Sequence, residues 1–269
     1  MLDFINAKML AIYFLTLYLT VQGAVVGSFL NVLVDRLPRG KSLLGRSKCD
    51  GCNRTLSPYE LVPIFSYFFL GGKSYCCKKK LSIRYSLVEG ITAIVFYFVS
   101  LWYLSSVGVE KIFEPITWIG LFALLLMSSI SIAMALIDFD LQILPDSLQL
   151  IFFTSVLMWL FAQSAFTISI IGEAAVVAMP ILLLYLGTKS RGMGYGDIKL
   201  AFTLGIWLGL VKGLLGIYFG FITGAIYGVI LLMTHKAKRK SHMAFGPFLL
   251  LGAWIAFLIG DKILRLFGF

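Results

Sequence analysis

Residues 112–138 read IFEPITWIGLFALLLMSSISIAMALID, an apolar run that ends in an aspartate. The run exceeds the about 20 residues that a helix needs to cross a bilayer. A carboxylate at the margin of hydrocarbon costs free energy, so an ionisable residue there is a functional-site hypothesis by default. Asp138 holds this position at the end of the run, and Asp197 holds the corresponding position just before a later apolar run. These two aspartates are therefore the first candidate site residues.

The composition of the chain is typical of a membrane protein. Its mean hydropathy is +0.93, and 59% of its 269 residues are hydrophobic while 13% are charged. That is too little polar surface to cover a water-soluble domain of this length. Apolar stretches long enough to cross a bilayer lie at residues 9–34, 86–104, 112–137, 147–186, 198–234 and 244–266.

The fourth and fifth of these stretches are long enough for two helices each. Polar breaks at Gln163-Ser164 and at Lys212-Gly213 mark the expected turns. Glycines recur at four-residue spacing at Gly205, Gly209 and Gly213, which is typical of helices that pack closely. The sequence thus predicts an all-α integral membrane protein with about eight transmembrane helices and one cytoplasmic loop domain between the first and the second.

Positive charge indicates which side of the membrane each loop faces. With eight alternating spans, most of the chain's 23 Lys and Arg residues fall on one side, in residues 35–85, 138–146, 188–197 and 235–240. Cytoplasmic loops carry such an excess. We therefore expect Asp138 and Asp197 at the cytoplasmic membrane surface and both termini on the opposite side. The net charge of +10 is then a signal of topology rather than of nucleic-acid binding.

The predicted cytoplasmic loop, residues 35–85, contains all four cysteines. Cys49 and Cys52 form a C-x-x-C pair, and Cys76 and Cys77 are adjacent. Cytoplasmic thiols stay reduced, so metal binding and free thiols are both better interpretations than a disulfide. Zinc would stabilise a loop too small to fold firmly alone. Adjacent cysteines in extended backbone point to opposite faces, however, which would strain a site that uses both. The alternative is that basic residues hold the loop against anionic lipid headgroups.

The remaining residues favour catalysis by carboxylates. The chain has two histidines, His235 and His242, so a Ser-His-Asp triad or a histidine-ligated catalytic metal lacks parts. Two aspartates within a few ångströms of each other share one proton, and the ionised one can activate water without a metal, as in aspartic proteases. Interhelical hydrogen bonding, a cation site and a cation- or proton-coupled transporter are the alternatives.

Residues next to the two aspartates are candidate supporting residues. Gly194 and Gly196 can adopt backbone conformations closed to other residues, and they would leave room beside Asp197 for an extended substrate strand. Asp140 follows Asp138 by two residues and so lies on a different side of a helix. We expect Asp140 to have a supporting role at most.

A series of motifs, taken in this order, resembles the bacterial type IV prepilin peptidases. The motifs are Gly27-Ser28-Phe29-Leu30-Asn31-Val32, Asp35-Arg36-Leu37-Pro38, Cys49-x-x-Cys52, Gly71-Gly72-Lys73, Arg84-Tyr85-x-Leu87-Val88-Glu89, Leu136-Ile137-Asp138, Leu144-Pro145-Asp146, Gly192-Met193-Gly194-Tyr195-Gly196-Asp197-x-Lys199 and Phe245-Gly246-Pro247. The resemblance covers nearly the whole chain. It implies a bifunctional enzyme of the bacterial inner membrane. Such an enzyme cuts the short basic leader from prepilins or type II secretion pseudopilins, and then methylates the new N-terminal residue with S-adenosylmethionine.

The resemblance also implies roles for individual residues. Asp138 and Asp197 would be the catalytic pair, with Lys199 as a supporting residue in the motif of the second aspartate. The zinc hypothesis for the loop uses Cys49, Cys52 and Cys77 as three ligands, with Cys76 or another group as the fourth. Two departures concern this site, because Ser74 stands where the family usually has its third cysteine and Cys76 is additional.

The sequence predicts three regions. Residues 1–34 form the first span, residues 35–85 form the loop domain associated with methyl transfer, and residues 86–269 form a seven-span peptidase domain. S-adenosylmethionine is cytosolic, and the loop is the only soluble segment large enough to help form its pocket. Gly71 and Gly72 are candidates for close backbone approach to it. The expected partners are prepilins or pseudopilins and membrane phospholipids, and a peptidase without methyltransferase activity is the alternative.

Overall fold

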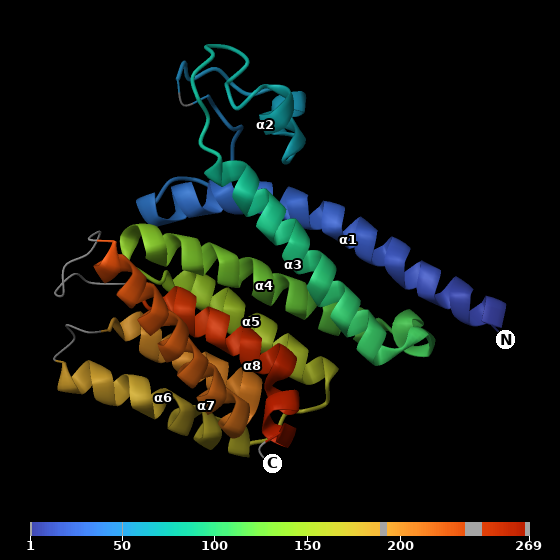
Figure 1. Ribbon diagram of the computed structural model, residues 1–269, viewed down its shortest axis with the longest axis vertical. Coiled ribbons are helices and arrows are strands. Elements are labelled where there is room, and N and C mark those ends of the chain that lie inside the picture. Colours follow the sequence, from blue (N-terminus) through green and yellow to red (C-terminus); the bar gives the residue numbers. More distant parts are fainter. Residues whose placement is uncertain (1, 50, 189–192, 235–243, 267–269) are drawn as a thin grey trace. The chain divides into compact units, whose positions relative to one another are not determined.

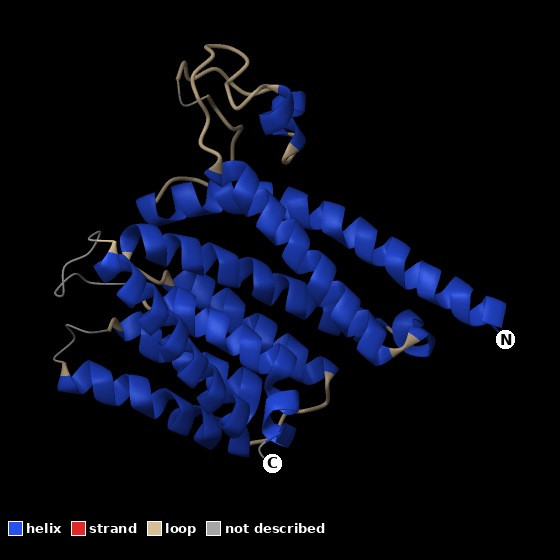
Figure 2. Ribbon diagram, viewed as in Figure 1, coloured by secondary structure: helices blue, strands red, loops and turns tan. Residues whose placement is uncertain are grey.

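The structure is a computed structural model that describes residues 2–49, 51–188, 193–234 and 244–266. Within these ranges the chain is helical and has no strand (Figure 2), so the all-α expectation is confirmed. Helices form because lipid offers no hydrogen bonds and a helix satisfies its own backbone groups. Six of the described helices are long and apolar enough to cross a membrane. They are α1 (Leu2–Arg36), α3 (Arg84–Val107), α4 (Pro115–Leu141), α6 (Ser169–Gly187), α7 (Tyr195–Met233) and α8 (Gly246–Leu266).

The chain divides into two compact units within α4. The first unit ends at Ala133, and the second begins at Met134. In the first unit, α1 packs along α3 (Figure 1). A Cβ built on Gly27 of α1 would lie only 2.7 Å from the Cα of Glu89 in α3. Small residues at helix interfaces allow backbones to approach this closely.

The segment between α1 and α3 contains short helices and turns. The short helices are η1 (Leu37–Arg39), η2 (Pro58–Leu61) and α2 (Phe65–Phe69), and a further one, η3 (Val109–Phe113), follows α3. Figure 1 shows this segment standing at the end of α1 and the start of α3. It is held there in part by Glu89 of α3, whose carboxylate accepts a hydrogen bond from the backbone N–H of Ile64 over 2.7 Å.

In the second unit, α7 packs between α6 and α8 and also contacts the shorter helix α5 (Asp146–Ala162). The expected turn at Gln163-Ser164 is confirmed, because α5 ends at Ala162 and Ser164 has a φ of 52°. A cluster of aromatic rings joins three of these helices. Trp207 of α7 lies edge-on to Trp254 of α8 and tilted against Phe257 of α8, with ring centroids 4.9 Å apart in both pairs. It also lies edge-on to Phe152 of α5, at 6.2 Å.

The helix α7 is two segments that meet at a break. Gly209 has a φ of 72° and a ψ of −175°, which are not helical values. A Cβ built on Gly213 would lie 3.5 Å from the Cα of Gly205, so the chain folds back on itself at this point. The predicted break at Lys212-Gly213 was wrong by three residues. Only a residue without a Cβ adopts the positive φ of the break at no steric cost, and that residue is Gly209.

Some expectations concern residues outside the described ranges. The basic run 235–240 with His235 and His242 belongs to this group, as does Gly192 of the glycine motif. The part of the charge argument that uses these residues stays a prediction.

Candidate active site

The structure brings Asp138 and Asp197 together. Asp138 lies in the last turn of α4 and Asp197 in the first turn of α7. Both side chains are buried, with 5% of Asp138 and 7% of Asp197 exposed. Their carboxyl groups are close enough to interact electrostatically. Buried carboxylates cost free energy unless they are hydrogen-bonded, so their partners in the protein matter.

The turn before α7 fixes the carboxylate of Asp197. The backbone N–H of Gly194 donates a hydrogen bond to Oδ2 of Asp197 over 2.9 Å, which places the aspartate as part of the N-terminal cap of the helix. Gly194 has ordinary extended dihedral angles, with φ −84° and ψ 157°, and Gly196 has no positive φ either. The expectation that these glycines are needed for unusual backbone conformations was therefore wrong.

Gly196 is instead a point of close packing. A Cβ at this position would lie 3.1 Å from the Cβ of Leu144 and 3.4 Å from Nε2 of Gln149. Both neighbours come from the segment around the start of α5. The missing side chain therefore lets the loop between α4 and α5 approach the start of α7, which brings the two aspartates within reach of each other.

The start of α8 fixes the carboxylate of Asp138. The backbone N–H of Gly246 donates a hydrogen bond to Oδ2 of Asp138 over 3.0 Å. A Cβ on Gly246 would lie 2.8 Å from that same oxygen and 3.2 Å from Cδ2 of Leu144. Sequence reasoning assigned no role to Gly246, although it lies in the quoted motif Phe245-Gly246-Pro247. Its place in the site follows from contact between segments that are 108 residues apart.

Gln149 is a second residue that the sequence did not single out. It is 7% exposed, and its Nε2 donates a hydrogen bond to the carbonyl oxygen of Leu144 over 3.2 Å. Its Oε1 is buried and has no hydrogen-bond partner among the described residues. A buried acceptor without a partner is uncommon in folded proteins and marks a place where a ligand can bind.

Lys199 and Asp140 lie further from the centre of the site. Lys199 donates a hydrogen bond to Oδ1 of Asp146 over 2.8 Å and lies over the ring of Tyr195, 5.0 Å from its centroid. This exposed ion pair joins the start of α7 to the start of α5. Asp140 is exposed, as expected for a residue on a different side of α4 from the buried Asp138.

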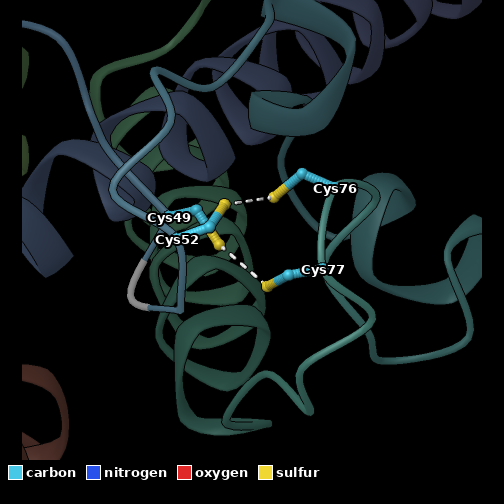
Figure 3. A group of neighbouring side chains, drawn as sticks. All are labelled: Cys49, Cys52, Cys76 and Cys77. Carbon is cyan, nitrogen blue, oxygen red and sulfur yellow. Dashed lines mark hydrogen bonds between the residues drawn. The ribbon is translucent and has the colours of Figure 1, made fainter.

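The four cysteines of the loop form one cluster. Their Sγ atoms all lie within 4.8 Å of one another. The closest pairs are Cys49 with Cys77, at 3.6 Å, and Cys52 with Cys76, at 3.1 Å (Figure 3). Four thiols gathered in this way match the ligand set of a structural zinc site. The concern that adjacent cysteines point apart does not apply, because Cys76 and Cys77 lie in a tight turn rather than in extended backbone.

The cluster is built from two turns of the same design. In the first, the N–H of Cys49 bonds to the carbonyl of Arg54 over 2.8 Å, and the N–H of Asn53 bonds to the carbonyl of Cys49 over 2.9 Å. Asn53 has a positive φ of 58°. This turn carries Cys49 and Cys52.

The second turn repeats this pattern 25 residues later. The N–H of Ser74 bonds to the carbonyl of Lys79 over 2.8 Å, the N–H of Lys78 bonds to the carbonyl of Ser74 over 3.1 Å, and Lys78 has a φ of 57°. Ser74 therefore occupies the position of Cys49, and Cys77 that of Cys52. The Oγ of Ser74 is 3.1 Å from Sγ of Cys77 and the residue is 3% exposed, so Ser74 lies inside the cluster.

Hydrogen bonds within the cluster divide the thiols by acidity. Backbone hydrogen bonds from Gly51 and Cys52 lower the pKa of Cys49 to about 6, whereas a hydrogen bond with Cys76 raises the pKa of Cys52 to about 11. The same contact with Cys52 lowers the pKa of Cys76. The thiolate is the form that binds metal, so these hydrogen bonds favour that form more at Cys49 and Cys76 than at Cys52.

Gly71 and Gly72 shape a turn after α2. Their φ angles are 60° and 67°, a region that favours glycine. Gly71 faces open space, whereas a Cβ on Gly72 would lie 3.0 Å from the hydroxyl oxygen of Tyr67. Gly72 therefore lies close to the hydroxyl end of Tyr67, where a side chain would not fit.

Comparison with known proteins covers both units. Residues 21–103 match the model of the bacterial peptidase A24 N-terminal domain, and residues 125–229 match that of the type IV leader peptidase family. A prepilin leader peptidase/N-methyltransferase of Pseudomonas aeruginosa is 34% identical over 98% of this chain and 96% of its own length. The proteins of that name in Neisseria gonorrhoeae and Bacillus subtilis are 30% and 28% identical, over 91% and 93% of this chain and 91% and 96% of their own lengths. No solved structure matches. The chain belongs to the type IV leader peptidase family.

Proposed function

We propose that this protein is a membrane aspartic peptidase that removes the leader of type IV prepilins or type II secretion pseudopilins, and that it then methylates the new N-terminal residue with S-adenosylmethionine. The observation that carries the peptidase half is the meeting of Asp138 and Asp197, each held by the N–H of a glycine. The relatives that carry both activities in their name support the methyltransferase half.

The two carboxyl groups can hydrolyse a peptide bond without a metal. Because like charges this close do not both ionise cheaply, one aspartate keeps its proton. The ionised carboxylate takes a proton from water as the water oxygen attacks the scissile carbonyl carbon, and the protonated carboxyl donates its proton to the carbonyl oxygen. Collapse of this tetrahedral intermediate breaks the C–N bond, and the leaving nitrogen takes up a proton from the pair. The glycine N–H groups keep one oxygen of each aspartate fixed during these transfers.

The topology that we propose has eight membrane crossings in the bacterial inner membrane. The crossings are α1, α3, α4, α5, α6, the two segments of α7, and α8. Asp138 ends one crossing, and α5 and α6 lead away and back to Asp197. The two segments of α7 then lead away and back to Gly246, whose N–H bonds to Asp138. An even number of crossings between these residues agrees with one shared face, which the charge distribution makes cytoplasmic, with both termini on the other side.

The division of labour that we propose follows three regions. Residues 1–34 anchor the first unit, residues 35–85 serve methyl transfer, and residues 86–269 carry the peptidase. Cys49, Cys52, Cys76 and Cys77 fit zinc and would hold it as a structural ion that keeps the two turns of the loop together. The chemistry assigned to the two aspartates does not depend on that ion.

One experiment tests both halves. The purified protein in detergent is incubated with a prepilin and S-adenosylmethionine labelled on its methyl group, and leader loss and methyl incorporation are followed separately. We expect cleavage to survive serine-protease inhibitors and chelators, and we expect methylation only of cleaved pilin. Cleavage without methylation would reduce the function to a peptidase, and sensitivity of cleavage to a chelator would contradict the carboxylate mechanism.

A further inference from the structure

The first unit contains a cavity that none of the roles above explains. Its volume is about 210 Å³, and it lies between the end of α1, the start of α3 and the cysteine loop. Polar residues from all three segments line it, among them Asn31 and Asp35 of α1, Glu60 and Tyr67 of the loop, and Tyr85 and Glu89 of α3. Ligand sites are concave and carry a few placed polar groups, and this cavity has both features.

The lining carries charges of both signs. Three carboxylates line the cavity, those of Asp35, Glu60 and Glu89, together with the cations of Arg36 and Lys48. Asp35 pairs with Arg39, and Glu60 pairs with Arg54 over 2.6 Å, so Glu89 is the carboxylate to consider for a ligand. Glu89 suits a cationic part of that ligand, and Arg36 and Lys48 suit an anionic part.

Glu89 is held in place by unusual local structure. It is 8% exposed, and it accepts the N–H of Ile64. Ile64 has a φ of 63°, which is rare for a β-branched residue and is typical of ligand clamps and active sites. Gly27 supports the same point, because a side chain there would collide with the backbone of Glu89. The hydrogen bond from Ile64 thus holds the carboxylate of Glu89 at the wall of the cavity, and the close approach of Gly27 holds its backbone.

Aromatic side chains complete the lining. Tyr67, Tyr75 and Tyr85 line the cavity together with the amide of Asn31. Tyrosine faces can stack on a purine base and attract a cation, and carboxylate and amide groups can bind ribose hydroxyls. Taken together, these groups suit a nucleoside that carries a positive charge.

We infer that this cavity binds S-adenosylmethionine, with Glu89 facing its positively charged methionyl part. The inference rests on the proposed methyltransferase function and assigns it a site. When bound, S-adenosylmethionine supplies a methyl group on a cationic sulfur. The α-amine of the cleaved pilin forms the new N–C bond, the electron pair of the broken C–S bond stays on sulfur as a neutral thioether, and the amine releases one proton to water.

The cavity also connects two features of the loop to the ligand. Tyr67 lines it, and Gly72 lies close to the hydroxyl end of that tyrosine; Cys49 and Ser74 of the cysteine cluster also line the cavity. Gly72 therefore acts on the ligand through Tyr67 rather than by direct contact, and the cluster forms part of the wall.

The test compares binding of the cationic donor with binding of its neutral product. The full chain in detergent, as wild type and as Glu89→Gln, is titrated with labelled S-adenosylmethionine and with S-adenosylhomocysteine. Glutamine keeps an oxygen for the N–H of Ile64 and removes only the charge. We expect Kd for the cationic donor to rise by about tenfold or more and Kd for the neutral product to change less. Glu110→Gln, an exposed residue of the same unit outside the cavity lining, is the matched control.

A second measurement does not depend on a variant. Ultraviolet crosslinking of labelled S-adenosylmethionine to the wild-type protein should label a peptide that contains Tyr67, Tyr75 or Tyr85. Label on α7 or α8, or an unchanged Kd in Glu89→Gln, would overturn the inference. Protection of these peptides by a pilin N-terminal peptide and not by the donor would assign the cavity to the methyl acceptor and would equally overturn it. If the wild type neither binds the donor nor transfers methyl, the proposed methyltransferase function fails instead.

Discussion

The backbone N–H of Gly246 donates a hydrogen bond to Oδ2 of Asp138 over 3.0 Å, and a Cβ on Gly246 would lie 2.8 Å from that oxygen. The start of α8 is thus in contact with the last turn of α4 at the candidate active site. This contact leaves no room for a side chain at position 246. A substitution there should therefore disturb the carboxylate of Asp138.

We expect Gly246→Ala to slow leader cleavage by about 10- to 100-fold, because the methyl group displaces the carboxylate by a fraction of an ångström and geometry of this kind strongly affects rate. Gly172→Ala in α6 is the control, since a Cβ there meets nothing within 4 Å. Both variants are assayed for cleavage of a prepilin at equal amounts of folded protein. Equal activity of the two variants would contradict the tight contact at Asp138.

Asp138→Asn and Asp197→Asn should each lower cleavage by roughly 10³-fold or more, because each removes one member of a proton-sharing pair. Asp140→Asn should be much milder, since Asp140 is exposed. Methyl transfer to a pilin that has already been cleaved measures whether the variants are folded. Substantial cleavage by either of the first two variants, at normal expression, would rule out the aspartic mechanism.

Gln149 should position the substrate. Its buried Oε1 has no hydrogen-bond partner among the described residues, so we expect it to accept an N–H of the bound pilin strand. Gln149→Leu keeps the volume and removes this acceptor, and it should raise KM by about 10-fold with a smaller change in kcat. A fall in kcat alone, with KM unchanged, would assign Gln149 to the catalytic step rather than to binding.

The metal content of the loop should depend on Cys76. We expect about one zinc per chain in the wild type and less in Cys76→Ser. The double variant Cys76→Ser with Ser74→Cys should regain the metal, because Ser74 occupies in the second turn the position that Cys49 has in the first. Cys76→Ser with Ser42→Cys has the same number of thiols and should not regain it. Recovery in the control would mean that thiol number, and not position, determines the metal content.

Glu173 should stabilise the break in α7. Its Oε2 accepts the N–H of Leu210 over 3.0 Å, at the start of the second segment. Helix starts of this kind lose about 1–2 kcal/mol when the capping side chain is removed. Thermal unfolding in detergent should therefore show a lower Tm for Glu173→Ala than for Glu173→Gln, which keeps an acceptor oxygen. The same Tm in both variants would show that Leu210 finds another partner.

The helices could be predicted from sequence because hydropathy and helix formation have one physical cause in lipid. The turn at Gln163-Ser164 carries polar side chains and was placed correctly. The break at Gly209 was not, because Gly205, Gly209 and Gly213 are equivalent in a pattern of spacing and only the fold shows which of them has a positive φ. A local sequence pattern shows which residues can pack closely, but it does not show which contacts those residues make in the fold.

The same limit applies to the residues of the candidate site. Asp138 and Asp197 stand out because each is a charge at the edge of an apolar run. Gly246 and Gln149 carry no such signal, since a glycine and a glutamine are unremarkable until distant segments meet. The cysteine turns could be predicted from the sequence only in part. The serine at position 74 was visible in the sequence, but its equivalence to Cys49 follows from matching backbone hydrogen bonds and the positive φ angles of Asn53 and Lys78.

The break at Gly209 also determines what surrounds the first segment of α7. That segment begins beside the active site and ends at this glycine, so from Tyr195 to Leu208 it is only about 21 Å long at about 1.5 Å per residue. The hydrocarbon core of a bilayer is about 30 Å thick. None of residues 197–208 is exposed, so neighbouring helices rather than lipid chains surround this short segment. The hydrophobic mismatch of a segment this short is therefore met by protein, and the position of Asp197 should depend little on the acyl-chain length of the host membrane.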